Sequence, residues 1–236
     1  MARTTVSALR EKEPGDERPA SRTVVEHAIE TIKHGIFEGH YVSGQRLIEA
    51  ELTRSLGVSR GPLREALRRL AADGLVEIEP YRGAAVSRMS RAELADALVV
   101  REVLEGLAAR LAAERIDEPG MRVRAATVMD ELKRAAENPD PTHYLEENDR
   151  FHHLIIELSG NVPLGRQVAQ LQMPTLRTAF FKLFDHRLQA ASLAQHREIL
   201  EAVIAGDGAR AERAMRSHVR RTMEVAKKLP DALFRS

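Results

Sequence analysis

The sequence contains no cysteine and no tryptophan, and aromatic residues make up only 4% of it. Without cysteine the chain can form no disulfide, no Cys-ligated zinc site and no iron–sulfur cluster, so any metal site must use His, Asn, Asp or Glu. The scarcity of aromatic side chains argues against binding single-stranded nucleic acid by base stacking. The lack of cysteine is compatible with a reducing cytoplasm, which is the location we expect.

Long apolar runs and an excess of one charge are missing as well. The apolar runs span only a few residues, whereas a membrane span needs about 18 or more, so we expect no membrane partner. Residues 1–20 lack the apolar core of a secretory signal and are interpreted as a disordered leader. The formal net charge is +1, so any DNA binding depends on local arginines rather than on a global basic field.

The composition changes near Ser90. Residues 21–90 mix helical and strand-like patterns, whereas residues 91–236 are rich in Ala, Leu, Arg and Glu and read as helix almost throughout. Ser90 followed by Glu93 is the pattern of a capping box that opens a helix. We therefore predict a mainly α protein with two domains, 21–90 and 91–236.

Apolar spacing and turn residues predict the elements of each domain. In the first domain the expected helices are 24–37, 49–56 and 59–73. A small β-hairpin follows, with strands at 76–78 and 84–86. In the second domain we expect a six-helix antiparallel bundle with helices at 91–115, 120–137, 141–159, 163–184, 189–205 and 208–228.

Two short helices that meet at Gly57 predict a helix-turn-helix. Arg60, Arg64 and Arg68 follow one another at intervals of four and therefore share one face of the second helix. Arginine can bond the edge of guanine with two hydrogen bonds or hold a phosphate. A helix N-terminus opened by Ser59 also favours a phosphate. This face is the predicted DNA-reading surface.

The hairpin after this helix pair makes the prediction more specific. Helix pairs with a glycine turn are common in bundles, and arginine-rich faces are usually only solvated, so an interaction module without DNA binding is an alternative. A hairpin with Arg82 and Gly83 at its tip would act as a wing beside the second helix. The combination favours a winged helix-turn-helix and makes the interaction module the weaker interpretation.

Several segments of the first domain resemble the GntR family of transcription regulators. They are 44–47, 51–52, 56–60, 62–67, 70, 73–75 and 82–83. In that family the residues that match Ser59, Arg60 and Arg64 approach DNA, and the residue that matches Gly83 enters the minor groove. Ser43 stands where the family usually has proline, a departure that we expect to affect only a turn.

Histidines in the second domain are spaced as metal ligands would be. Asn148 and His152 are four residues apart on one predicted helix and share a face. His196 and His218 each lie eleven positions from Asp207, so an antiparallel helix pair places them at the same height. A single histidine is more often structural, but this convergence predicts a site of three imidazoles and an oxygen, suited to Zn or Ni.

Neighbouring residues offer further candidates. His153 points about 100° away from His152 on an ideal helix and is the weaker ligand candidate. Arg101 could clamp a carboxylate with two hydrogen bonds. An ion pair between Arg101 and a glutamate of the same domain is an equally good interpretation.

The second domain resembles the FCD effector domain of the FadR subfamily. The matching segments are 148–152, 159–161, 196–203, 206–207 and 211–218. The resemblance implies that Asn148, His152, His196 and His218 are the metal ligands, although many relatives have Asp in place of Asn148. A count of six helices, rather than seven, points to the shorter, VanR-like branch.

The expected function is that of a ligand-responsive, sequence-specific regulator of transcription. We expect a homodimer on a pseudo-palindromic operator that represses a metabolic operon and is released by a small carboxylate. The alternative is a metal-dependent enzyme built on a helical bundle. The sequence has no His-Glu-x-x-His and no Glu-x-x-His motif, so we expect no enzymatic activity.

Overall fold

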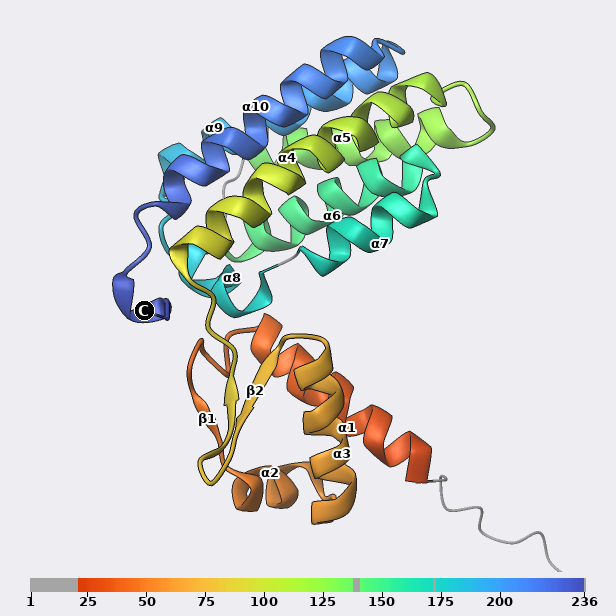
Figure 1. The fold of residues 1–236 in the computed structure, drawn as a ribbon. Coiled ribbons are helices and arrows are strands. Elements are labelled where there is room, and N and C mark those ends of the chain that lie inside the picture. Colours follow the sequence, from red (N-terminus) through yellow and green to blue (C-terminus); the bar gives the residue numbers. More distant parts are fainter. Residues whose placement is uncertain (1–20, 138–140, 172, 236) are drawn as a thin grey trace, which may run out of the picture.

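The first part of the chain is a small helix-and-sheet unit. The computed structural model describes residues 21–137, 141–171 and 173–235, and the predicted leader lies outside these residues. Figure 1 shows this unit below a larger helical part. Its elements are α1 (Ser21–Phe37), β1 (Arg46–Leu47), α2 (Glu49–Leu56), α3 (Arg60–Ala72), β2 (Val76–Glu79) and β3 (Gly83–Val86).

The sheet has three antiparallel strands in the order β1-β3-β2. The predicted hairpin is confirmed, with Val76 opposite Val86, whereas β1 was not predicted because two residues carry no alternating pattern. The hydrophobic core of this unit contains the apolar stripe of α1, including the fully buried Ile32 and Ile36. Burial of this stripe against α3 explains why the amphipathic sequence forms a helix there.

The turn between α2 and α3 has the geometry that the sequence predicts. Gly57 adopts φ 66°, a left-handed conformation, and its N–H donates to the carbonyl of Thr53. Ser59 occupies the N-cap position of α3, but its side chain makes no capping hydrogen bond there. The N-terminus of α3 thus keeps unpaired N–H groups that could donate to an anion.

The second part is helical, as predicted. Ser90 caps the first helix with a complete capping box: its hydroxyl accepts from the Glu93 N–H, and its own N–H donates to the Glu93 carboxylate at 2.7 Å. The helices are α4 (Arg91–Glu114), α5 (Met121–Glu137), α6 (Pro141–Ser159), α7 (Val162–Gln170), α8 (Pro174–Phe181), α9 (His186–Ile204) and α10 (Gly208–Ala226), followed by the short 3₁₀ helix η1 (Asp231–Leu233).

The helix count needs one correction. The single helix predicted over 163–184 is divided into α7 and α8, so the described residues of this part form seven α-helices rather than six. Proline disfavours helical geometry at the residue before it, and Met173, before Pro174, lies outside both helices. The prediction of the shorter, VanR-like branch rested on a count of six helices, and this count is not observed.

The long helix α4 lies at the centre of the bundle and packs against α6, α9 and α10 (Figure 1). Small residues on α4 allow this close approach. A Cβ atom added to Gly106 would come within 2.6 Å of the Arg216 side chain on α10. The apolar core runs between these helices and includes the fully buried Phe151 and Leu200.

The end of the chain packs at the junction between the two parts (Figure 1). The buried Ser43 hydroxyl donates to the carbonyl of Leu233 at 3.0 Å. Arg91 contacts Asp231 at 2.6 Å and lies 4.3 Å from the ring centre of Phe234. Ser43, which stands where the family usually has proline, was expected to affect only a turn. Its hydroxyl also provides a hydrogen bond between the two parts of the molecule.

Candidate metal centre and DNA-binding surface

Three of the four predicted metal ligands lie together inside the helical part. His152 on α6, His196 on α9 and His218 on α10 place one ring nitrogen each within 4.8 Å of the others. The Nε2 atoms of His196 and His218 are 3.3 Å apart. Helices α9 and α10 are joined through Asp207, the N-cap of α10, so the two histidines meet at equal distances from the turn.

In His152 and His218 the contacts of Nδ1 leave Nε2 available for a metal ion. His152 Nδ1 lies 2.8 Å from a carboxylate oxygen of Glu105, and His218 Nδ1 lies 3.4 Å from the amide oxygen of Gln195. Because both neighbours are acceptors, each Nδ1 is expected to carry the proton, which leaves a lone pair on Nε2. The buried Nδ1 of His196 has no hydrogen-bond partner among the described residues.

Burial keeps two of these imidazoles neutral. Burial, together with the neighbouring His218 and His152, lowers the pKa of His196 well below its usual value. Burial, and then the neighbouring His152, lower the pKa of His218 to about 3. Near neutral pH both side chains therefore offer lone pairs, and a cation is the natural partner for buried nitrogens that converge in this way.

Glu105 is a site residue that the sequence analysis missed. Its carboxylate is buried between His152 and Arg101, whose guanidinium lies 2.6 Å away. Burial alone would raise the pKa of Glu105, but the charge of Arg101 and the contact with His152 outweigh burial and hold it far below its usual value. The i,i+4 spacing of Arg101 and Glu105 on α4 was the available signal. The structure thus shows the ion pair that was weighed against a carboxylate clamp for Arg101.

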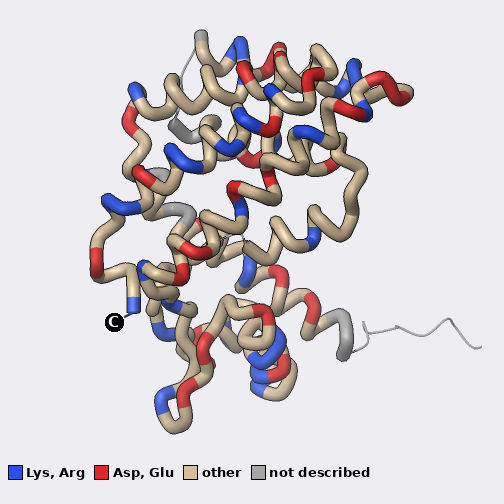
Figure 2. Tube along the Cα trace, turned by 45° about the horizontal axis from the view of Figure 1, so that its top comes forward, with Lys and Arg blue, Asp and Glu red and all other residues tan. Residues whose placement is uncertain are grey.

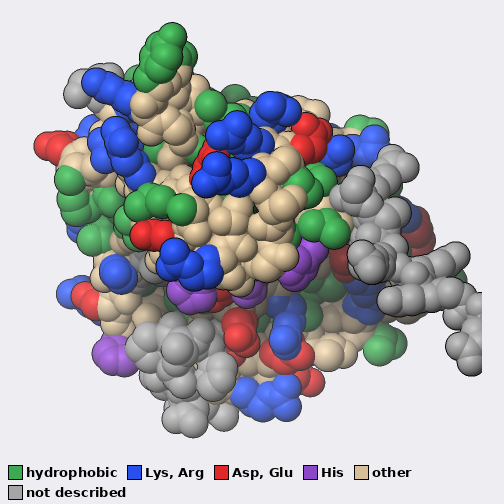
Figure 3. All heavy atoms as spheres, turned by 90° about the horizontal axis from the view of Figure 1, so that it is seen from below, with side chains coloured by type: hydrophobic (Ala, Val, Ile, Leu, Met, Phe, Trp, Pro, Cys, Tyr) green, Lys and Arg blue, Asp and Glu red, His purple; other side chains and the backbone are tan. Residues whose placement is uncertain are grey.

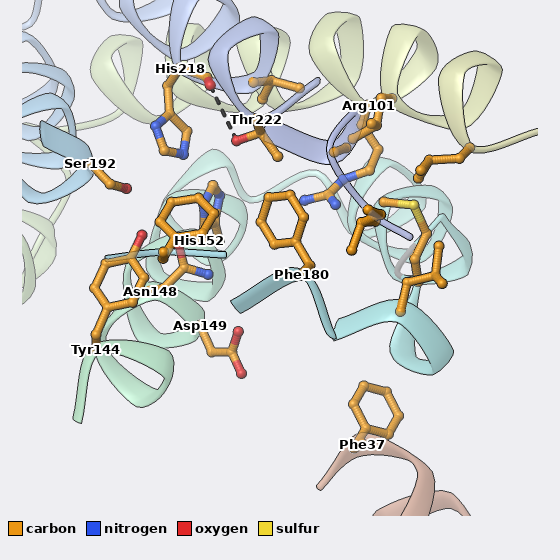
Figure 4. A pocket seen from close by; sticks show the side chains of 18 of the residues that line it. Phe37, Arg101, Tyr144, Asn148, Asp149, His152, Phe180, Ser192, His218 and Thr222 are labelled. Carbon is orange, nitrogen blue, oxygen red and sulfur yellow. Dashed lines mark hydrogen bonds between the residues drawn. The ribbon is translucent and has the colours of Figure 1, made fainter. Parts of the chain in front are cut away.

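A cavity of about 420 Å³ opens beside the histidines. Arg101, Asn148, His152 and His218 line it, so the fourth predicted ligand shares the cavity with the three-histidine group (Figure 4). Burial raises the pKa of the lining residue Tyr144 to about 12, so its hydroxyl stays protonated and can donate a hydrogen bond. The arrangement can hold a cation and a small polar group next to it.

The other histidine of this helix is less suited to the site. His153, although it lies on the rim of the cavity, is exposed, and its Nδ1 faces the carbonyl of Asp149 at 2.7 Å. It is not part of the three-histidine group. The predicted preference for His152 over His153 agrees with this placement.

The predicted DNA-reading residues lie on an exposed face of the first part. Arg64 pairs with Glu49 at 3.0 Å and Arg68 with Glu65 at 3.4 Å, whereas Arg60 is exposed without an ion pair among the described residues. Exposed pairs of this kind contribute little to stability, so a phosphate or a base can replace the carboxylate. Figure 3, a view from this end, shows basic side chains gathered with few acidic ones between them.

The hairpin tip projects from the same unit. Arg82 lies 3.4 Å from Glu79, and Gly83 adopts φ 83°. Tyr81, fully exposed with φ 64°, is a tip residue that the sequence analysis did not single out, although its place after Pro80 was a turn signal. Figure 2 shows basic and acidic residues mixed along both parts, in keeping with the small net charge.

Sequence comparisons assign both parts of the chain. The model described as "Bacterial regulatory proteins, gntR family" matches residues 24–86, and the model described as "FCD domain" matches residues 96–221. The chain belongs to the GntR family of regulators. This GntR-family chain combines the DNA-binding domain with an FCD domain, the arrangement of a ligand-responsive, DNA-binding transcription regulator.

Individual relatives agree with this assignment. The "Probable D-xylose utilization operon transcriptional repressor" of Paenarthrobacter nicotinovorans is 31% identical over 203 residues, which are 86% of this chain and 88% of the relative. An "Uncharacterized HTH-type transcriptional regulator in unstable DNA locus" of Streptomyces ambofaciens is 37% identical over 179 residues, 75% of this chain and 74% of the relative. The solved structure "E. coli McbR/YncC" has the same fold, with a TM-score of 0.71 at 21% identity over 88% of this chain and 99% of that one.

The family assignment settles which of the functions considered applies. The GntR-family relatives are regulators of transcription and not enzymes, so the metal-dependent enzyme is set aside. The interaction module without DNA binding is set aside for the same reason. Within the described residues, no helix has both the length and the apolar character that crossing a membrane requires.

Proposed function

We propose that this GntR-family protein represses a metabolic operon in the cytoplasm and is released from DNA by a small organic acid. The observation that carries the proposal is the three-histidine group beside a cavity that is also lined by Arg101. Repression of a metabolic operon is supported by the D-xylose operon repressor among the relatives.

The proposed metal ion is divalent, Zn or Ni, and is held by His152, His196, His218 and Asn148. In a tetrahedral zinc site with Zn–N bonds of about 2.0–2.1 Å, two ligand nitrogens lie about 3.3–3.4 Å apart. The 3.3 Å between the Nε2 atoms of His196 and His218 supports such an ion. Four neutral ligands leave the ion its full charge, and its chemical role is to bind a carboxylate oxygen of the effector.

Arg101 is the proposed second anchor for the effector. Its guanidinium contacts Glu105 through Nε at 2.8 Å and through one terminal nitrogen at 2.6 Å. Arginine has five N–H donors, so further donors remain for a ligand in the cavity that Arg101 lines. Because Glu105 already balances the charge of Arg101, the metal ion supplies most of the attraction for the anion.

The DNA-reading unit is proposed to be domain 21–90. Ser59, Arg60, Arg64 and Arg68 would lie along the major groove, and the hairpin tip with Arg82 and Gly83 would reach the minor groove. One recognition helix covers only a few base pairs, so adequate specificity requires two half-sites and therefore a homodimer. Domain 91–236 would supply the effector site and the contact between subunits.

In the test, the protein is titrated into labelled DNA from upstream of its own gene. Fluorescence anisotropy at two salt concentrations measures the binding. A regulator gives a specific complex that weakens when the acid is added. Chelation of the metal should abolish the response to the acid. Light scattering should give the mass of a dimer on one DNA fragment. Absence of a specific complex would overturn the regulatory function, and a monomer on DNA would overturn the two half-sites.

A further inference from the structure

The cavity beside the histidines has two chemically different ends. Near the proposed metal site the wall is polar, with Ser192 from α9, Asn148 from α6 and Thr222 from α10 (Figure 4). Toward the junction the wall is apolar and includes Leu98 and Leu229. The charged residues Arg101 and Asp149 also line the cavity (Figure 4), and a ligand that fills it packs against apolar side chains toward the junction.

The apolar end belongs to a separate hydrophobic cluster at the junction of the two domains. Leu98, Leu176 and Leu229 are each only 2% exposed and pack together in this cluster. The partly buried Phe180 packs against the cluster and faces the cavity (Figure 4). These four side chains offer no hydrogen-bond partner to a hydroxyl group, so a sugar acid packed against them would lose hydrogen bonds to water.

The DNA-binding domain contributes one side chain to the cavity. Phe37, the last residue of α1, is half-buried and lines the cavity from below, whereas the other lining residues come from the helical part (Figure 4). Helix α1 contacts α8 at this place and packs along its length against α3, the predicted recognition helix. A ligand that touches Phe37 therefore contacts both domains at once.

We infer that the effector is a monocarboxylate with an apolar body, either aromatic or a medium-length chain, and that Phe37 is part of its binding site. This inference rests on the proposed function for the position of the carboxylate at the metal. From there the body extends along Leu98 and Phe180 to Phe37. The cavity of about 420 Å³ falls within the range of ordinary ligand pockets and exceeds what an acid of three or four carbons fills.

Contact with Phe37 also explains how the ligand alters DNA affinity. A ligand changes an equilibrium only through a difference in its affinity for the two states. Any movement of the DNA-binding domain against the bundle changes the distance from Phe37 to the cavity. A bound apolar body thus favours the arrangement in which Phe37 covers it, and Phe37 is the residue through which the ligand acts on α1 and α3.

The test compares four acids of equal charge by isothermal titration calorimetry on the metal-loaded protein: acetate, gluconate, 3-phenylpropanoate and octanoate. We expect the two apolar acids to bind at least about tenfold more tightly than acetate or gluconate. Tighter binding of gluconate would overturn the inference, as would the absence of binding by both apolar acids at millimolar concentration.

The variant Phe37→Ala tests the domain-bridging contact, with Val123→Ala, an exposed apolar side chain on α5 outside the cavity, as the control. Phe37→Ala should weaken 3-phenylpropanoate severalfold, leave acetate and zinc affinity unchanged, and reduce the effect of saturating 3-phenylpropanoate on DNA affinity. Val123→Ala should leave acid binding and that effect on DNA intact. Unchanged binding and an unchanged DNA response in Phe37→Ala would overturn the role of Phe37.

The two proposals fail in different ways. If the protein bound no metal, the proposed function would lose its carboxylate site. The ranking of the four acids and its dependence on Phe37 would still be measurable in the metal-free protein. Zinc binding with no preference for the apolar acids would instead leave the proposed function in place and overturn this inference.

Discussion

The two domains use their arginine–glutamate pairs in opposite ways. In the DNA-binding domain Arg64 and Glu49 meet at the surface, with side chains 59% and 33% exposed. In the helical domain Arg101 and Glu105 meet in the interior, with side chains 19% and 2% exposed. The distances are similar, so the surroundings and not the geometry distinguish the two pairs.

Exposure to water determines how costly it is to separate each of the two pairs. Solvent screens the surface pair, and either partner can be exchanged for another charge at little cost. Removing one partner of the interior pair leaves a charge without water or counter-charge around it. Arg64 is thus free to exchange Glu49 for a phosphate, whereas Arg101, Glu105 and His152 form a fixed chain that orients an imidazole.

The largest effect should come from the histidines in the interior. His218→Ala should abolish stoichiometric metal binding, with a fall in affinity of more than about 100-fold, because loss of even an outer partner of a ligand costs about 10–100-fold. The measurement is metal analysis of the purified protein, with circular dichroism to verify folding. The exposed His153→Ala is the control and should keep its metal. Full metal occupancy in His218→Ala would remove His218 from the site.

The interior pair should matter strongly for stability. Glu105→Ala in the metal-free protein should lower the free energy of unfolding by about 3–5 kcal/mol, since it leaves Arg101 buried without its partner. The measurement is urea denaturation. Asp117, which pairs with Arg122 at the surface and is 82% exposed, provides the matched variant Asp117→Ala. Equal small losses in both variants would show that burial does not separate the two kinds of pair.

The recognition face should show its effect on DNA and not on folding. Arg64→Ala is expected to weaken the specific complex about 5- to 150-fold and to relax the base preference at one position. Competition binding against a set of single-base variants of the operator measures both. If operator affinity did not change, the assignment of this face of α3 would be wrong.

The smallest effect is expected for Arg60 at the start of α3. If Arg60 holds a phosphate, Arg60→Ala should weaken binding to all sequences alike and lower the slope of log K against log salt by about one. Anisotropy titrations on specific and unrelated DNA at several salt concentrations test this. Loss of affinity for the specific sequence alone would assign Arg60 to base contact instead.

Short stretches of sequence were enough to predict several local features of the structure. The left-handed turn at Gly57 and the capping box at Ser90 depend on a few neighbouring residues, and both appear as the sequence predicts. Equal spacing from Asp207 was enough to predict that His196 and His218 face each other, because an antiparallel helix pair has a fixed rise per residue. At β1 the segment was too short for a periodic pattern, whereas at the break between α7 and α8 the local signal, Pro174, was present but was not used in the prediction.

Other features depend on contacts between residues that are distant in the sequence. Only the packing of α4 against α6 shows that Glu105 serves His152 rather than Arg101 alone. Only the docking of α1 on α8 places Phe37 in the cavity, and only the return of the chain end gives Ser43 its partner Leu233. Spacing along one helix fixes which residues share a face, but which face meets which partner is decided by the burial of all faces together.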